Sequence, residues 1–234
     1  MTSFDQMLNH LPEPLRHEVA QYWEAFQESS QTAGLGLPAG AILESLARVW
    51  ACSEFVARAC IREPGLLAEL SASGDLLAPY SPGDLTNRLE RALANATDEE
   101  QLTVALRRCR RREMVRIAWR DLAGLAELTE TLGDLTDLAD AAVNAALERL
   151  YARQCQQRYG APRDSQGQPQ QLVVLGMGKL GGRELNFSSD IDLILTYPHQ
   201  GQTDGPRVVS NEEFFRRLGQ RLSKVLAEIT AEGF

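Results

Sequence analysis

The chain has 234 residues, of which 44% are hydrophobic and 24% are charged, and its formal net charge at pH 7 is −8. This length can bury the core of one domain or two, and no apolar run approaches the ~20 residues that a bilayer-spanning helix needs. The acidic balance, and a start that lacks the segments of a secretory signal, predict a cytoplasmic protein that binds neither membrane nor nucleic acid.

The first 160 residues are rich in leucine, alanine, glutamate and arginine, and their apolar residues recur at helical spacing. Thr97-Asp-Glu-Glu100 has the pattern of a capping box, which predicts that a helix starts there. One face of this helix is expected to begin with Leu102, Leu106 and Cys109. A later helix carries an apolar face made of Val143, Leu147, Leu150 and Tyr151. We therefore expect an all-helical domain over residues 1–160.

Seven arginines lie between Arg107 and Arg120, inside this helical region. They could bind a substrate phosphate or an acidic partner. We favour a solvated helix face on which most of them bond to neighbouring glutamates and aspartates. Trp119 follows Ile117 and Ala118 directly, and it is expected to lie in the core.

The composition changes at residues 159–169, where glycine, proline, serine and glutamine replace the helical pattern, and we place a linker at residues 161–170. Two short apolar runs follow, Leu172–Leu175 and Ile191–Tyr197, with the lengths and branched residues of strands. Ser210-Asn-Glu-Glu213 is a second capping box and opens another helix. The apolar face of that helix is expected to contain Phe214, Leu218, Leu222, Val225 and Ile229.

The order strand, loop, strand, helix is typical of an α/β or an α+β protein, and we predict the α+β class, with the strands in a second domain over residues 171–234. Two strands are too few for a sheet that is stable by itself. We therefore expect this domain to be incomplete at its C-terminus.

The chemical information lies in residues 174–194, which begin with a glycine-rich loop. Gly176-x-Gly178-x-x-Gly181 follows a strand, as in a dinucleotide-binding fingerprint. That motif also needs a long helix and an acidic residue ~20 residues further on, and the spacing here is too short. A phosphate-binding P-loop is disfavoured as well, because Lys179 is followed by leucine where serine or threonine would bind the metal.

Asp190 and Asp192 are the candidate catalytic and metal-binding residues. Alternate residues of a strand point to one face, so the two carboxylates are expected ~6–7 Å apart on a shared side. There they can hold the Mg²⁺ or Mn²⁺ ions that phosphoryl chemistry uses. The alternative is a solvated strand start, but Asp192 lies in an apolar run where an unpaired charge is costly. The glycines would let the backbone approach phosphate, and Ser188 and Ser189 could donate hydrogen bonds to it.

Two segments resemble the glutamine synthetase adenylyltransferase family. Residues 176–194 are similar to its nucleotidyltransferase motif nearly residue for residue, and residues 107–122 are similar to its arginine-rich helix. The family belongs to the DNA polymerase β-like nucleotidyltransferases, whose general pattern has glycine or serine where this chain has Lys179. A lysine at this position is instead similar to the motif of the glutamine synthetase adenylyltransferase family. The resemblance implies a polymerase β-like mixed-sheet domain over residues 171–234.

The resemblance also implies a bifunctional enzyme that controls nitrogen assimilation. One of its domains attaches AMP from ATP to a tyrosine of glutamine synthetase, and the other removes that AMP with phosphate and releases ADP. The helical region ahead of the motif matches the N-terminal, adenylyl-removing half. The implied partners are glutamine synthetase and the regulatory PII signalling protein. A third carboxylate would lie beyond Phe234, so we expect the chain alone to be inactive or weak.

Two alternatives stay open, a non-catalytic module that docks nucleotide or glutamine synthetase, and a nucleotidyltransferase that acts on a small molecule. Members of the second group are usually shorter at the N-terminus and lack the arginine-rich helix. The residues expected to bind nucleotide or phosphate are Gly176, Gly178, Lys179, Gly181, Gly182, Arg183, Ser188 and Ser189.

Overall fold

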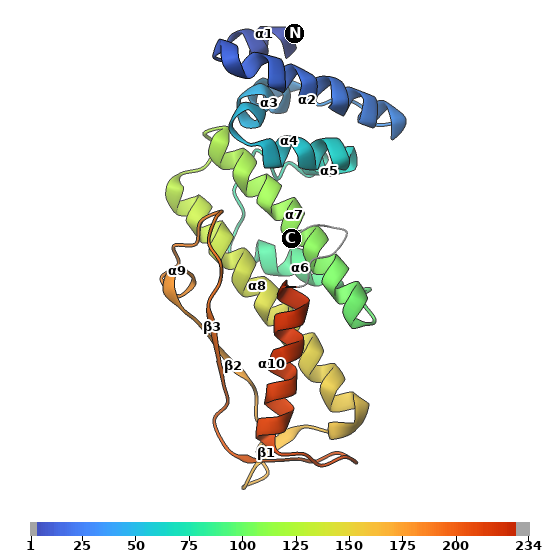
Figure 1. Cartoon of the computed structure of the whole chain (residues 1–234), viewed down its shortest axis with the longest axis vertical. Coiled ribbons are helices and arrows are strands. Elements are labelled where there is room, and N and C mark those ends of the chain that lie inside the picture. The colour runs from blue at the N-terminus through green and yellow to red at the C-terminus, as the bar shows by residue number, and fades with distance from the viewer. Residues whose placement is uncertain (1–3, 228–234) are drawn as a thin grey trace. The chain divides into compact units, whose positions relative to one another are not determined.

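The computed structural model describes residues 4–227, in which helices precede strands (Figure 1). The elements up to Tyr159 are the helices α1 (Phe4–Asn9), α2 (Glu13–Thr32), α3 (Gly40–Cys52), α4 (Glu54–Arg62), α5 (Pro64–Ser73), α6 (Asp84–Leu93), α7 (Glu99–Leu122), α8 (Leu128–Gln154) and the π-helix η1 (Cys155–Tyr159). They are followed by β1 (Pro162–Asp164), β2 (Val173–Gly176), α9 (Gly178–Gly181), β3 (Leu193–Thr196), β4 (Gly201–Thr203) and α10 (Asn211–Ala227). The predicted α+β class is confirmed.

The chain divides into two compact units, and the long helices α7 and α8 contribute to both. Unit 1 consists of the residues up to Pro82 together with Arg110–Asp134, and unit 2 consists of Gly83–Cys109 and the residues from Leu135 onward. The linker predicted at residues 161–170 lies inside unit 2 and contains β1. The change in composition thus marks the point where helices give way to strands. Within residues 4–227, no helix has the length and apolar character needed to cross a bilayer.

Unit 1 has a core rich in aromatic side chains. Trp23 stacks on Phe4 with ring centroids 4.3 Å apart, and Phe26 meets Trp50 edge-on at 5.5 Å. Trp119 of α7 is fully buried in the same core. Its indole nitrogen donates to the Ser45 hydroxyl at 3.2 Å, which satisfies the polar end of the ring. The predicted core position of Trp119 is confirmed.

Unit 2 has its own core, in which α10 packs with α8 and the first half of α7. The two helices α8 and α10 lie side by side in Figure 1, with β2 and β3 running along them. The buried apolar residues of α10 are Phe214, Phe215, Leu218, Leu222 and Val225. This confirms the predicted face, apart from Ile229, which lies outside the described residues.

The two predicted capping boxes have different outcomes. Ser210 caps α10 as predicted, since its hydroxyl accepts from the Glu213 backbone N–H at 3.1 Å. The pattern predicts Thr97 as the cap of α7, but α7 begins one residue later. The Asp98 carboxylate accepts from the backbone N–H of Gln101 at 2.8 Å, and the Gln101 side chain accepts from the Thr97 N–H at 2.8 Å. Aspartate is a stronger N-cap residue than threonine, so the N-cap of α7 is Asp98, one residue after the predicted Thr97.

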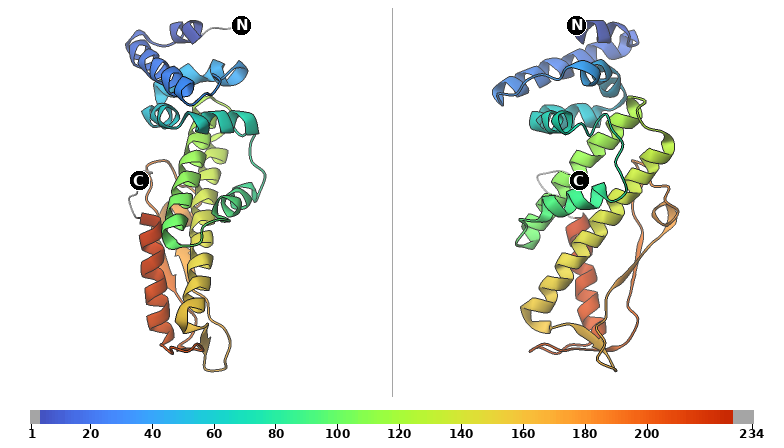
Figure 2. Two further views of the ribbon diagram at one scale, coloured as in Figure 1. Left: turned by 90° about the vertical axis from the view of Figure 1, so that its right-hand side faces the viewer. Right: turned by 180° about the vertical axis from the view of Figure 1, so that it is seen from behind.

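The strands form two antiparallel pairs, β1 with β4 and β2 with β3. The two predicted apolar runs became β2 and β3, whereas β1 and β4 have three residues each and were not predicted. Figure 2 shows β1 and β4 beside the start of α10. Within residues 4–227 the strands pair only in the antiparallel sense, so they do not themselves form the mixed sheet that the resemblance implies.

Candidate active site

The glycine loop and the two aspartates lie at the same end of the β2–β3 pair. The Met177 N–H donates to the Asp192 carbonyl at 2.9 Å, which extends the ladder one residue beyond Gly176 opposite Leu193. Leu195 contacts Gly219 of α10, so it lies on the covered face. Because residues alternate between the faces of a strand, Asp192 lies on the opposite, open face.

Asp190 and Asp192 are both exposed, and the residues that follow them, Ile191 and Leu193, are half-buried. The structure begins β3 at Leu193, so both aspartates lie just ahead of the strand that was predicted to contain them, and their exposure alternates with that of Ile191 and Leu193. Among residues 4–227, neither carboxylate forms a hydrogen bond or an ion pair. Both are therefore available to a ligand from solvent, and their catalytic role remains a prediction.

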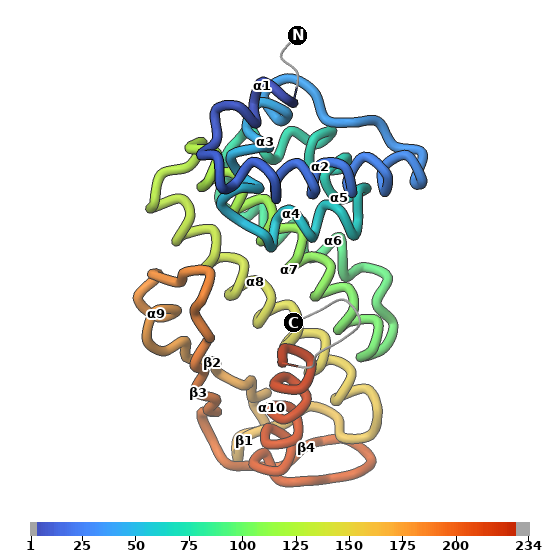
Figure 3. The backbone as a smooth tube through the Cα atoms, turned by 45° about the horizontal axis from the view of Figure 1, so that its top comes forward, coloured from blue at the N-terminus to red at the C-terminus, as the bar shows by residue number. Residues whose placement is uncertain are grey.

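The predicted glycines shape a tight turn between β2 and β3, which the tube in Figure 3 shows as α9. Gly178 has φ +54°, a conformation that favours glycine. A Cβ on Gly181 would lie 2.5 Å from the Gly176 carbonyl oxygen, so only glycine fits there. Leu180 is buried beneath Gly176 and fixes the turn from inside. Gly182 follows α9 directly, at its C-cap.

The two predicted serines are tied to an asparagine that the sequence reasoning did not single out. Ser189 donates to the Asn186 side-chain oxygen at 2.6 Å, and Ser188 donates to the same atom at 3.2 Å. The Lys179 ammonium lies 3.3 Å from the oxygen of Ser189, the residue directly before Asp190. Each hydroxyl has one proton. The two hydroxyl groups must therefore rotate away from Asn186 before they can donate to phosphate. An asparagine just ahead of two serines is a signal of such a turn.

Arg183 points to α8. Its Nη2 donates to the Asp137 carboxylate at 2.5 Å, and its Nη1 lies 3.8 Å from the Asp140 carboxylate. The hydrogen bond to Asp137 raises the pKa of Arg183. Burial raises the pKa of Asp140, although the neighbouring Arg183 charge opposes this. Sequence reasoning missed both aspartates, because they lie more than forty residues before Arg183 in the chain. The predicted contact of Arg183 with nucleotide stays a prediction.

The exposed aspartate pair has the ligand type that a Mg²⁺ ion would need. Mg²⁺ is usually bound by one or two carboxylates together with substrate phosphates and water. Within the part of the chain that the structure describes, no group of three histidine, cysteine, aspartate or glutamate side chains is placed to hold a metal. Among residues 4–227, the carboxylates of Asp190 and Asp192 would therefore be the two protein ligands of the ion. Phosphate oxygens and water would complete its coordination shell.

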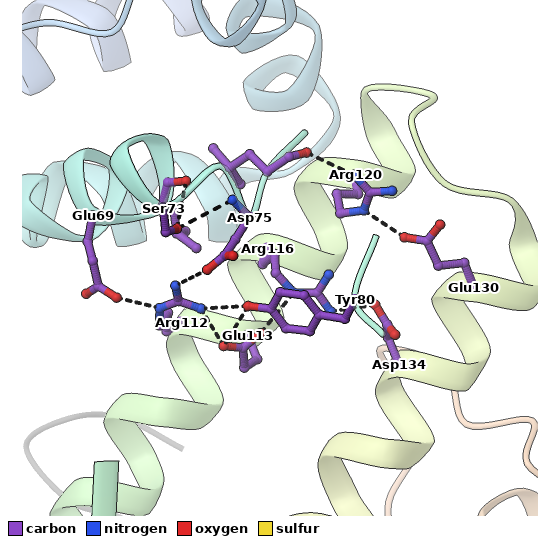
Figure 4. A network of polar contacts seen from close by, with 12 residues as sticks. Glu69, Ser73, Asp75, Tyr80, Arg112, Glu113, Arg116, Arg120, Glu130 and Asp134 are labelled. Atoms are coloured by element: carbon purple, nitrogen blue, oxygen red, sulfur yellow. Dashed lines mark hydrogen bonds and ion pairs between the residues drawn. The ribbon is translucent and has the colours of Figure 1, made fainter. Parts of the chain in front are cut away.

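Arg112, Arg116 and Arg120 of α7 belong to a cluster of polar contacts inside unit 1 (Figure 4). Arg116 is fully buried and Arg120 is 2% exposed, so the prediction of a solvated face is wrong for them. Arg112, which is partly buried, bonds to Asp75 at 2.5 Å and Glu69 at 2.8 Å. The predicted bonding to acidic neighbours is confirmed for these side chains.

Arg116 is the centre of this cluster. It bonds to Glu113 at 2.9 Å and Asp134 at 2.5 Å, and its guanidinium lies 3.6 Å from the centroid of the Tyr80 ring. Burial lowers the pKa of Arg116, but the Asp134 and Glu113 charges outweigh it, so its pKa is raised. Because its charge is balanced inside unit 1, Arg116 serves the fold.

A helical region followed by a glycine loop and an Asp-x-Asp pair just ahead of β3 is the arrangement that the sequence predicts for an α+β protein of the nucleotidyltransferase type. Comparison with known proteins identifies the family. The family model of glutamate-ammonia ligase adenylyltransferase matches residues 43–234, and the chain belongs to this family.

Curated relatives carry the name bifunctional glutamine synthetase adenylyltransferase/adenylyl-removing enzyme. The protein from Thioalkalivibrio sulfidiphilus is 51% identical over 97% of this chain and 23% of its own length. The protein from Nitrosococcus oceani is 48% identical over 94% of this chain and 22% of its own length. The one from Pseudomonas aeruginosa is 50% identical over 82% of this chain and 20% of its own length. The chain thus spans less than a quarter of these relatives.

Proposed function

We propose that this chain supplies the site that removes AMP from an adenylylated tyrosine of glutamine synthetase, in an enzyme that also attaches AMP from ATP. The observation that carries the proposal is the pair Asp190 and Asp192, exposed and unpaired among residues 4–227 beside the glycine loop. The names of the relatives, which combine both activities on glutamine synthetase, support the substrate. The direction, removal, follows from the resemblance to the N-terminal half.

The proposed reaction is an in-line displacement at the phosphorus of the tyrosine-linked AMP. An oxygen of inorganic phosphate forms a bond to this phosphorus, and the bond from phosphorus to the tyrosine oxygen breaks. The products are ADP and tyrosine, whose oxygen takes up the proton that hydrogen phosphate brings. Mg²⁺ or Mn²⁺ bound at the site would neutralise charge on the transferring group.

The residues of the chain have three proposed tasks in this displacement. Asp190 and Asp192 would hold the divalent ion. The turn at Gly178, which has open space around its Cα, lets the backbone approach the phosphate. The Lys179 ammonium, beside the Ser189 hydroxyl, adds positive charge at the same end of the strand. The further proposals are regulation by the PII protein and a cytoplasmic location.

Release of ADP from adenylylated glutamine synthetase and phosphate tests the proposal in the complete gene product. Asp190→Asn and Asp192→Asn are expected to lower the rate by at least ~100-fold, because charge on the transferring group is no longer neutralised. Glu148→Gln is the matched control, since it removes an exposed carboxylate of α8 outside the site, and it is expected to leave the rate unchanged. If both aspartate variants release ADP like the wild type, the proposal fails.

A further inference from the structure

The glycine loop is fastened to the fold at two points. The first is the buried side chain of Leu180 under Gly176. The second is Arg183, whose guanidinium meets the carboxylates of Asp137 and Asp140 on α8. These aspartates are three residues apart, so they lie on the same side of the helix and face one guanidinium together.

The backbone links the second point directly to the loop. The Arg183 N–H donates to the Leu180 carbonyl at 3.1 Å, and the Glu184 N–H donates to the Lys179 carbonyl at 2.8 Å. A displacement of Arg183 therefore moves Lys179, the cation next to the Asp-x-Asp strand. The position of the loop is thus coupled to that of Arg183.

Arg183 holds an unusual conformation. Its φ is +57°. Among residues 4–227, Arg183 is the only residue other than glycine that has a positive φ. That region is unfavourable for side chains other than glycine, asparagine and aspartate. The chain places arginine there, directly after Gly181 and Gly182, and the guanidinium lies against two carboxylates. An arginine at this position thus brings its guanidinium to α8.

A direct contact with substrate phosphate fits this geometry less well. The Nη2 atom of Arg183 is already bonded to Asp137, and Asp140 adds a second negative charge beside it. A phosphate that approached the same guanidinium would meet two like charges. The arrangement favours an anchor over a ligand.

We propose that Asp137 is a positioning residue, which together with Asp140 holds Arg183 and thereby keeps the glycine loop in place beside Asp190 and Asp192. This inference rests on the proposed function. It concerns the placement of the loop, so it can be tested by a readout of loop order as well as by ADP release. Reactions of this kind depend strongly on position, and small displacements of a phosphate-binding loop lower the rate.

The first test combines hydrogen exchange with kinetics on the complete gene product. Asp137→Asn is expected to speed amide exchange in residues 178–184 about 5-fold and to lower kcat for ADP release about 5-fold. The thermal midpoint should stay the same, since the side chains of Arg183 and Asp137 are 57% and 48% exposed and such pairs add little stability. Glu54→Gln is the matched control, because it breaks another exposed pair, that with Arg58, and it should change neither readout.

The second test exchanges the charges, Asp137→Arg with Arg183→Asp. Arginine is a good helix former and aspartate tolerates positive φ, so both positions accept the change. If Arg183 is an anchor, we expect the swapped protein to recover exchange protection and kcat to within about 2-fold of the wild type, whereas each single variant stays impaired. If Arg183 binds phosphate instead, the swap stays as impaired in ADP release as Arg183→Asp alone, and the inference is overturned.

The outcomes also separate this inference from the proposed function. Unchanged exchange in Asp137→Asn overturns the anchor, even if Asp190→Asn and Asp192→Asn abolish ADP release. Faster exchange that the swap reverses supports the anchor, even if those two variants keep full ADP release and the proposed function fails.

Discussion

Arg116 shows how a single charged side chain can serve the fold of unit 1. Its charge is fully buried between Glu113 and Asp134. Arg116→Ala leaves both carboxylates without this partner, and breaking a buried pair in this way costs ~3–5 kcal/mol. We expect the free energy of unfolding in urea to fall by about this amount.

The matched control is Arg58→Ala, which removes an arginine that is 71% exposed and paired with Glu54. Such a surface pair is worth ~0–1 kcal/mol. Equal losses for the two variants would contradict the account of the cluster.

At the residue scale, the sequence predicted the two aspartates and the glycines of the loop, because their spacing along the chain is itself the signal. It could not predict that Arg116 is buried or that Arg183 meets Asp137. The partners of these arginines come from other elements, and only the packing of the chain brings them together. The shift of the α7 cap to Asp98 has a local cause, and the known ranking of caps could have found it.

Among the elements, the β1–β4 pair depends on an acidic side chain in the loop after β4. Asp204 accepts from the Ala161 N–H at 2.7 Å and from the guanidinium of Arg163. The bond from Arg163, together with that from Ala161, lowers the pKa of Asp204 below its ordinary value of 3.8. A group with a lowered pKa in the folded state stabilises the fold above its unfolded pKa, and the contribution disappears as the pH falls through the folded value.

We therefore expect the stability of the wild type to drop more steeply below pH ~4 than that of Asp204→Asn, and the two curves to be parallel between pH 5 and 7. Denaturant unfolding across this pH range measures the difference. Identical slopes in acid would show that the carboxylate does not support the strand pair.

The long elements were easier to predict than the short ones. The apolar face of α10 and the runs that became β2 and β3 follow from periodicity, which gains weight with length. The three-residue strands β1 and β4 have no pattern of their own, because they are fixed by contacts with each other and with α10. The π-helix η1 likewise left no signal in the composition.

For the whole molecule, the two units each have a hydrophobic core, and α7 and α8 contribute to both. This division does not follow the change of composition along the chain, since a helix that runs through two units keeps one pattern throughout. The family, by contrast, was readable from the sequence, because residues 176–194 carry it in one continuous segment. The proposed chemistry is concentrated in that segment.

The measurement that tests the central claim most directly is the Mg²⁺ dependence of ADP release from adenylylated glutamine synthetase by the complete gene product. We expect EDTA to abolish release and added Mg²⁺ to restore it. We also expect Asp192→Glu, which keeps the charge but moves the carboxylate, to need at least ~10-fold more Mg²⁺ for half of its maximal rate, with Glu148→Gln unchanged. Full ADP release in EDTA, or the same Mg²⁺ dependence in Asp192→Glu as in the wild type, would contradict a metal site at Asp190 and Asp192.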